Sequence, residues 1–371
     1  MKKIISFALF DTGETILSAL IYSVFFPLYI TKYIDPKIYS WVYGFTFLVS
    51  FLFALQIGKY ADRTGRRKEF FIIFATLTAL LCFSLGFLTD NPMLSLFVFS
   101  LMSISHQQSF VFYNSMLLNF DTKGLASGLG VSFGYVGSAI ALVFFAKMFS
   151  IPDVYFIAAF VFLVLALPSM VFLKNPSMYQ KVNLKAVFKD KKFILTIISI
   201  LSLTEVANTL IAMMSVYLKN VFGFDDVEIY KIIGISAIGG ILGGVFWGFL
   251  SDRFSVDKVF PIGFFLWVVF LVLLSVIPKE LVLLAGFFAG FSLGHLWTVS
   301  RVYILSNFPK EEISTRMSFL SLTERLASTT GLFVWGLFLL TTSDNYKLSA
   351  LLMSVFPITG FLIFIYAKKV T

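Results

Sequence analysis

The chain contains the stretch Gly58-Lys-Tyr-Ala-Asp62-Arg63-Thr-Gly65-Arg66-Arg67-Lys68, a basic turn that lies between two long apolar segments. A shortened copy, Gly248-Phe-Leu-Ser-Asp252-Arg253, follows 190 residues later and again separates two apolar segments. A charged turn that recurs at about half the chain length of an apolar sequence predicts a membrane protein built from two related halves. We expect the turns to form a cytoplasmic gating motif, whose residues are Gly58, Asp62, Arg63, Gly65, Arg66, Arg67, Gly248, Asp252 and Arg253.

The composition excludes a water-soluble domain. Of the 371 residues, 58% are hydrophobic and 13% are charged, whereas about 25% of the residues of a soluble domain are charged. The 47 phenylalanines are too many for one core to bury, so lipid must solvate much of the surface. The net charge of +9 is confined to short loops, which indicates membrane topology rather than nucleic-acid binding.

The sequence predicts twelve membrane-spanning helices, each of which needs about 20 mostly apolar residues. The segments are 6–30, 40–58, 69–88, 93–120, 125–149, 154–173, 193–218, 229–250, 259–277, 281–308, 316–341 and 348–367. They do not alternate polar and apolar residues as barrel strands do. We therefore expect an all-α membrane protein with an N-terminal six-helix bundle (1–173), a basic linker (174–192) and a C-terminal six-helix bundle (193–371).

The basic residues predict the orientation of the chain. With both termini in the cytoplasm, twenty Lys and Arg lie inside and seven lie outside, a bias that decides for cytoplasmic termini. We expect a multi-pass protein of the plasma membrane that works as a monomer. The Lys-rich linker is either a solvated connection or a segment that docks on anionic lipid headgroups or closes the cytoplasmic mouth.

Ionisable and polar side chains within the predicted spans form the candidate site. A charge in hydrocarbon costs roughly 2.5–3.5 kcal/mol on insertion scales, so each one requires a function or a partner. The two halves place such residues at matching positions, since Asp11 and Glu205 are 194 residues apart and the two histidines are 189 apart. We expect substrate or proton binding around a shared polar cavity by Asp11, Glu14, His106, Tyr113, Glu205, Asn208, His295, Arg301, Glu324 and Arg325.

Each of these residues also has a plainer interpretation. Asp11 and Glu14 would then hold helices together or reach water near the cytoplasmic end. The arginines either receive an anionic substrate group bidentately or pair permanently with a carboxylate. The histidines would be packing residues.

Other motifs favour packing over chemistry. Gly240-x-x-x-Gly244-x-x-x-Gly248 and Gly286-x-x-x-Gly290-x-x-x-Gly294 place small faces along two helices, which predicts close helix packing. Gly130-Val-Ser-Phe-Gly134 matches a nucleophile elbow but lies inside a predicted span, where an elbow cannot form. We find no metal-binding, nucleotide-binding or catalytic pattern, and expect neither a cofactor nor an enzyme.

The eleven-residue turn that begins at Gly58 resembles the loop between helices 2 and 3 of the major facilitator superfamily. Phe7-Ala-Leu-Phe-Asp11, Phe112-Tyr-Asn-Ser115 and Ser300-Arg301 resemble the branch of autophagy-related vacuolar effluxers and their bacterial relatives. The resemblance implies the major facilitator fold, with helices 1, 4, 7 and 10 around the cavity, and solute export with amino acids as the substrate class. Thr12-Gly13-Glu14 departs from the small or amide residues more usual in that branch.

The function that we expect is secondary active transport of a small polar solute by alternating access. Export of an amino-acid-like solute coupled to protons fits the acidic spans and the resemblance. Two alternatives stay open, namely a lipid or amphiphile flippase or drug exporter of the same fold, and a receptor or scaffold without flux.

Overall fold

The computed structural model describes residues 1–176 and 182–370, without the side chains of residues 226, 325, 328 and 329. The chain forms two compact units. Unit 1 comprises Met1–Val182 and Pro309–Ser318, and unit 2 comprises Asn183–Phe308 and Phe319–Thr371. The boundary thus falls inside the expected linker, and a short segment from the second half of the sequence belongs to unit 1. The part of the chain that the structure describes is helical and contains no strand.

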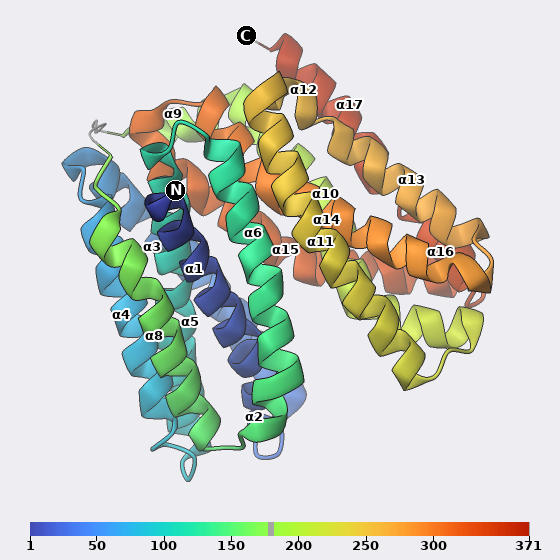
Figure 1. The fold of residues 1–371 in the computed structure, drawn as a ribbon, viewed down its shortest axis with the longest axis horizontal. Coiled ribbons are helices and arrows are strands. Elements are labelled where there is room, and N and C mark those ends of the chain that lie inside the picture. Colours follow the sequence, from blue (N-terminus) through green and yellow to red (C-terminus); the bar gives the residue numbers. More distant parts are fainter. Residues whose placement is uncertain (177–181, 371) are drawn as a thin grey trace. The chain divides into compact units, whose positions relative to one another are not determined.

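Unit 1 is built from long helices that lie side by side (Figure 1). They are α1 (Lys2–Leu17), which continues through η1 (Ser18–Phe25) and α2 (Phe26–Ile30), then α3 (Pro36–Thr64), α4 (Arg67–Leu85), α5 (Pro92–Ser115) with η2 (Met116–Asn119), α6 (Lys123–Ile140) with η3 (Ala141–Phe145) and α7 (Ala146–Met148), and α8 (Asp153–Phe172). Helix α1 packs against α6 and α8, α4 packs against α5 and α8, and α3 packs against α5. The π-helical turns η1 and η3 contact each other.

Unit 2 contains the remaining helices. They are α9 (Leu184–Lys189), α10 (Lys191–Phe222), α11 (Asp226–Phe254), α12 (Val256–Val259), α13 (Ile262–Val276), η4 (Lys279–Leu281), α14 (Val282–Asn307), η5 (Lys310–Glu312), α15 (Ile313–Thr341), α16 (Tyr346–Leu352) and α17 (Val355–Lys369), of which η5 and the first residues of α15 belong to unit 1. Helix α11 packs against α14, α10 packs against α17, and α13 packs against α14 and α16.

The turn residues of the sequence become helix caps. Asp35 and Asn91 accept backbone N–H groups at the starts of α3 and α5, and each is followed by proline at the first helical position. Asp225 forms a capping box with Glu228 at the start of α11. These caps satisfy N–H groups that a helix end leaves without partners, which is why the helices begin at these residues.

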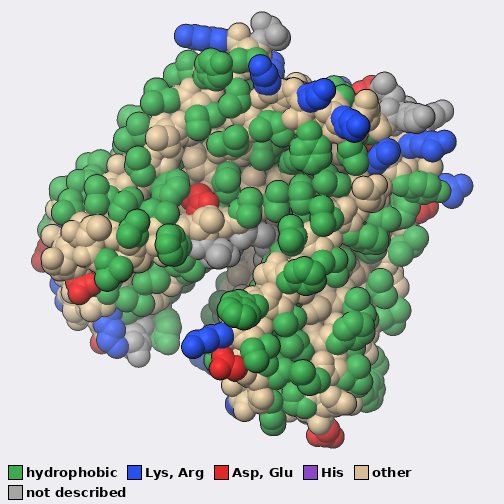
Figure 2. All heavy atoms as spheres, turned by 180° about the vertical axis from the view of Figure 1, so that it is seen from behind, with side chains coloured by type: hydrophobic (Ala, Val, Ile, Leu, Met, Phe, Trp, Pro, Cys, Tyr) green, Lys and Arg blue, Asp and Glu red, His purple; other side chains and the backbone are tan. Residues whose placement is uncertain are grey.

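Ten helical segments in the described chain are long and apolar enough to cross a membrane. The other two of the twelve predicted spans correspond to α5 and α15, which have 24 and 29 residues but carry many polar side chains. Figure 2 shows hydrophobic side chains over much of the helix surface, where a soluble protein would expose polar groups. Trp41 and Leu340, for example, are 78% and 80% exposed. The surface is that of a multi-pass membrane protein.

The glycine faces predicted from the sequence lie in the contact between α11 and α14. A Cβ atom on Gly294 would lie 2.7 Å from the backbone nitrogen of Gly244, and one on Gly290 would fall on the carbonyl group of Ser236. The two backbones therefore touch, as expected for helices that pack without large side chains between them. Close packing of these helices is confirmed. Gly134 in the elbow-like motif likewise packs against Thr15 of α1, in the middle of α6.

Gly290→Ala is expected to lower the stability of the purified protein by about 1–3 kcal/mol, because the added methyl group must push α11 away from α14. Gly234→Ala, on α11, is the matched control because nothing lies within 4 Å of its Cβ position. Thermal melting followed by tryptophan fluorescence should show a lower transition for the first variant alone. Equal shifts of the melting temperature in both variants would show that helix propensity, and not the contact between α11 and α14, determines the change in stability.

Candidate functional site

Asp11 lies on α1 with its side chain buried against α5. The Tyr113 hydroxyl donates a hydrogen bond to Asp11 Oδ2 at 2.8 Å and lies 2.9 Å from the carbonyl oxygen of Phe7. The rings of Phe7 and Phe10 lie against the Tyr113 ring, with centroids 4.0 and 4.3 Å away. These aromatic contacts hold the phenol in place, so the buried carboxyl group keeps the donor that it needs. The structure thus brings together two of the predicted site residues.

Glu14, one turn further along α1, faces His106 of α5. The His106 Nε2 atom lies 3.2 Å from Glu14 Oε1, and the Ser18 hydroxyl donates to the same oxygen at 2.8 Å. The side chains of His106 and Glu14 are 4% and 18% exposed. The two groups form an ion pair when the imidazole is protonated, but His106 Nε2 makes no hydrogen bond in the described part of the chain. A small reorientation of either side chain would bring the carboxyl group and the imidazole into line for proton exchange.

The surroundings of this pair include features that the sequence analysis missed. The Tyr22 ring stacks on the His106 imidazole, with centroids 5.1 Å apart. Glu14, Ser18 and Tyr22 are spaced by four residues and share one face of the helix, so this spacing could have revealed Tyr22. The helix becomes π-helical at Ser18, and π-helical turns are frequent at functional sites.

In unit 2, Glu205 of α10 lies against α15. The Thr330 hydroxyl donates a short hydrogen bond to Glu205 Oε1. One turn along, the Asn208 side-chain amide donates to the Glu324 carbonyl oxygen at 2.9 Å. A Cβ atom on Gly331 would lie 2.7 Å from Glu205 Oε2, so only glycine lets the helices approach this closely. Three predicted residues, Glu205, Asn208 and Glu324, therefore join the same two helices, and the sequence did not point to Thr330.

The remaining predicted residues of unit 2 are His295, Arg301 and Arg325. His295 is buried, its Nε2 atom lies 2.9 Å from the Val259 carbonyl oxygen, and its ring meets the Trp247 ring edge-on at 4.9 Å. A Cβ atom on Gly263 would lie 2.6 Å from His295 Nδ1, so the imidazole packs directly on α13. Arg301 is buried on α14. The side chain of Arg325 lies outside the described part of the chain. The matched histidines of the two halves thus have different surroundings.

The first basic turn forms a buried network with the start of α15, within unit 1. Asp62 and Arg67 side chains are both 0% exposed. Asp62 Oδ1 receives hydrogen bonds from Arg67 Nη2 at 2.9 Å and from the Ser314 backbone N–H at 3.0 Å. Asp62 Oδ2 accepts from the backbone N–H and the hydroxyl of Thr315, both at 2.9 Å. A carboxylate therefore caps the amino end of α15, where the helix dipole favours a negative charge.

Arg67 completes this network. Its Nε donates to the Ser314 hydroxyl at 3.1 Å, and its Nη2 donates to the Glu311 carbonyl oxygen at 3.0 Å. Gly58 permits the approach, since its Cβ would lie 3.2 Å from the backbone of Ser314. Gly65 has a φ of 71°, a left-handed conformation that suits glycine and ends α3. We call Asp62, Arg67, Ser314 and Thr315 the latch network.

The start of the linker is bonded to the two residues that follow Arg67 in the chain. Asn175 Oδ1 accepts the Lys68 backbone N–H at 2.6 Å, and Asn175 Nδ2 donates to Glu69 Oε2 at 2.7 Å. The second basic turn differs from the first, because Asp252 is exposed and Arg253 lies over the rings of Phe249 and Phe254. The two turns are alike in sequence, but in this structure only Asp62 is buried.

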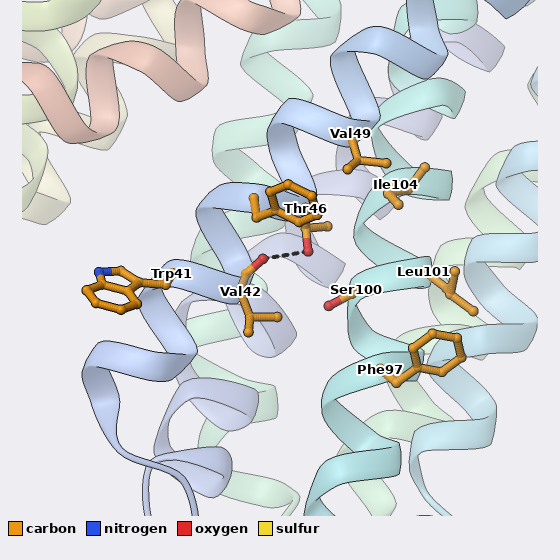
Figure 3. Close-up of a pocket in the computed structure, with 9 residues that line it drawn as sticks. Trp41, Val42, Thr46, Val49, Phe97, Ser100, Leu101 and Ile104 are labelled. Carbon is orange, nitrogen blue, oxygen red and sulfur yellow. Dashed lines mark hydrogen bonds between the residues drawn. The ribbon is translucent and has the colours of Figure 1, made fainter.

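A separate groove lies between α3 and α5. It has a volume of about 460 Å³ and is lined by Trp41, Val42, Phe45, Thr46, Val49, Phe97, Ser100, Leu101 and Ile104. Figure 3 shows the apolar side chains along its two walls and the Thr46 hydroxyl turned back to the Val42 carbonyl oxygen, to which it donates at 2.8 Å. None of its lining residues is ionisable. The groove suits an apolar chain better than a polar solute.

The family model of the Major Facilitator Superfamily matches residues 5–246 and 195–371. The chain belongs to the major facilitator superfamily. An uncharacterized protein of Aquifex aeolicus (strain VF5) is 57% identical over 366 residues, which cover 99% of this chain and 97% of that protein. The facilitator fold and the membrane-spanning helices make the chain a transporter rather than an enzyme.

Solved structures share the fold of this facilitator. A bacterial homologue of the iron transporter ferroportin, in an outward-facing state, has a TM-score of 0.78 at 15% identity and covers 99% of this chain and 98% of that chain. The E. coli fucose:proton symporter has a TM-score of 0.80 at 13% identity, with 98% and 97% covered. The human organic anion transporter MFSD10 (TETRAN) has a TM-score of 0.78 at 11% identity, with 98% and 99% covered. At these identities the likeness concerns the fold alone.

Asp62→Asn is expected to destabilise the facilitator by about 3–5 kcal/mol, because it leaves the buried Arg67 guanidinium without its countercharge. Glu280→Gln removes the same charge from an exposed position and should stay within about 0.5 kcal/mol of the parent. Denaturation of both variants in one detergent measures the difference. If the two variants have the same free energy of unfolding, the stability of the latch network does not depend on the charge of Asp62.

Gly331→Ala is expected to loosen the contact of α10 with α15 by forcing the Glu205 carboxyl group away from its place. Gly336→Ala, on the same helix, has nothing within 4 Å of its Cβ position and serves as the control. The Thr209 hydroxyl lies even nearer to this Cβ position than the Glu205 carboxyl group, so both side chains must be shortened to make room. Gly331→Ala should therefore be less destabilising in a Glu205→Ala/Thr209→Ala background, by at least about 0.5 kcal/mol in a mutant cycle. If Gly331→Ala were equally destabilising in both backgrounds, a close contact at Gly331 would be contradicted.

Proposed function

We propose that this transporter moves a small polar solute by alternating access and couples the movement to protons. The observation that supports the coupling best is the Glu14–His106 pair, with its separation of 3.2 Å on two membrane-spanning helices. Ionisable groups inside a bilayer usually mark substrate or proton pathways, because each one carries an insertion penalty. The fold neighbour described as a fucose:proton symporter is consistent with the proposal.

Three acids and one histidine, with the hydroxyl groups beside them, would divide the work of proton and solute binding. Glu14 and His106 exchange the proton, and Ser18 holds the Glu14 carboxyl group in line through its hydrogen bond. Asp11 supplies a second acid in the same unit, with Tyr113 as its fixed donor. In unit 2, Glu205 is the corresponding acid, and its loss of a proton would strengthen its attraction for donors on α15.

The arginines of unit 2 would select the solute. A guanidinium group binds a carboxylate bidentately, so Arg301 or Arg325 can receive the anionic group of an amino-acid-like solute. The resemblance to the effluxer branch supports export and this substrate class. His295 has a packing environment, so its proposed part is to hold α13 and α14 together rather than to bind the solute.

The latch network would act as the cytoplasmic gate. It ties α3 and α4 to the first turn of α15, and its hydrogen bonds must be broken and remade if these helices move apart. A buried network with two discrete states, made or broken, is suited to a switch between conformations. We also propose cytoplasmic termini, on the distribution of basic residues, together with the plasma membrane as location and a monomeric state.

A second candidate function is transport of an amphiphile, and the groove between α3 and α5 favours it. Its volume of about 460 Å³ and its apolar walls would accept an acyl chain or the hydrophobic part of a drug. In this function the acids of α1 would handle a charged headgroup.

Glu14→Gln is expected to abolish proton coupling, since an amide cannot exchange a proton with His106. A thermal-shift screen of amino acids at two pH values first identifies a solute, because a bound solute stabilises the protein by mass action. That solute is then added to proteoliposomes that contain pyranine. Proton movement should occur with the parent and should fall at least about 100-fold in the variant, the lower end of the range for one acid–base group.

Glu280→Gln is the control for this experiment, since Glu280 is exposed in η4 and its neutralisation should leave proton movement unchanged. Full proton flux in Glu14→Gln would remove this carboxyl group from the mechanism. Stabilisation by lysophospholipids, with no polar solute active in the screen, would favour the amphiphile function instead.

A further inference from the structure

Lysine side chains gather on α9 and on the first turn of α10, both in unit 2. Lys185, Lys189 and Lys191 are exposed, and Lys192 is half-buried beside them. Asp190 is the one acidic residue between positions 182 and 192. Lys191 is also the first residue of a membrane-spanning segment, so the cluster lies at the depth where a bilayer presents its headgroups.

The acidic residue in this cluster is engaged elsewhere. Asp190 Oδ1 accepts the backbone N–H of Phe193 at 3.0 Å and caps the amino end of α10. Lys191 and Lys192 follow directly, at the helix end where the dipole disfavours a positive charge. Lysines in this position do not serve the stability of α10. Because the charges of these lysines oppose the stability of their own helix, they indicate a function other than stabilising α10.

Helix α9 is fixed to unit 2 by its apolar side. The Val187 side chain is buried, and the Phe188 ring meets the Phe319 ring edge-on with centroids 5.2 Å apart. Phe188 is nevertheless 51% exposed. The short helix therefore presents lysines and part of an aromatic ring together, which is the pattern of a segment that lies in a membrane interface.

We infer that α9 and the first turn of α10 form a docking surface for the anionic headgroups of phospholipids in the adjacent leaflet. The lysines attract the headgroup phosphates, and the exposed edge of Phe188 enters the acyl boundary. Each lysine near an anionic surface strengthens the interaction about fivefold. This surface is separate from the proton and solute sites, so its test does not depend on transport.

The opposite end of unit 2 offers a matched control. Lys279 lies over the Phe224 ring with its Nζ 4.6 Å from the centroid, and Lys347 lies over the Phe222 ring at 5.6 Å. These two lysines are already engaged by aromatic faces of the protein itself. Their replacement by glutamine removes as much charge as the same change at Lys185 and Lys189.

The experiment places a solvatochromic dye on Ala186→Cys, an exposed position of α9. Labelling is selective because the natural Cys82 is buried. The labelled full-length protein is reconstituted into nanodiscs of phosphatidylcholine with an increasing fraction of phosphatidylglycerol. The dye emission should shift to the blue as the phosphatidylglycerol fraction increases. The fraction that gives half of the maximal shift should depend on the lysines.

In K185Q/K189Q the apparent affinity for phosphatidylglycerol should fall about 25-fold, from two losses of about fivefold each. K279Q/K347Q should stay within about twofold of the labelled parent, and K185R/K189R should retain the shift and so exclude a folding defect. The inference is overturned by a parent that does not respond, or by a K185Q/K189Q response equal to that of the parent. It is also overturned if inorganic phosphate, at equal ionic strength in phosphatidylcholine discs, reproduces the shift.

Discussion

The structure depends on the high free energy of a charged group that has left water. Inside membrane-spanning helices a carboxylate needs polar partners, and four of the described acids meet a polar group of a neighbouring helix. Asp62 binds Arg67 and the amino end of α15, Asp11 accepts from Tyr113, Glu14 lies beside His106, and Glu205 accepts from Thr330. The acids therefore join helices and also provide sites that can exchange protons. A change of protonation or conformation at one acid thus alters a contact between two helices.

These polar contacts require backbones that lie very close together. Lipid tails give no hydrophobic drive for one helix to associate with another, so small residues and van der Waals contact must supply it. Gly58 allows the start of α15 to approach Asp62, and Gly331 allows Glu205 to approach α15. Gly290 and Gly294 bring α11 against α14. Glycine faces and buried acids thus form one arrangement, since a methyl group at Gly58 or Gly331 would lengthen the hydrogen bonds beside it.

The linker is anchored separately at each of its described ends. In unit 1, Asn175 bonds to the backbone of Lys68 and the side chain of Glu69, next to Arg67 in the latch network. In unit 2, Val187 and Phe188 hold α9 in place, and Asp190 begins α10. A gate in one unit and a lipid-binding surface in the other would therefore each lie next to residues of the segment that joins the two units.

The sequence by itself determined the helical class, the membrane environment, the glycine faces of α11 and α14, and which helices carry ionisable groups. Each of these properties follows from composition or from helical periodicity, and both depend only on the order of residues along the chain. The tertiary structure alone decided the partners, because periodicity states which face of a helix is polar but not how that helix is rotated against its neighbour. His106 and His295 occupy matching positions in sequence, yet one meets Glu14 and the other packs on Trp247. Asp62 and Asp252 share a motif, but Asp62 is buried because the amino end of α15 meets it with Ser314 and Thr315, whose part in the latch no local pattern could reveal.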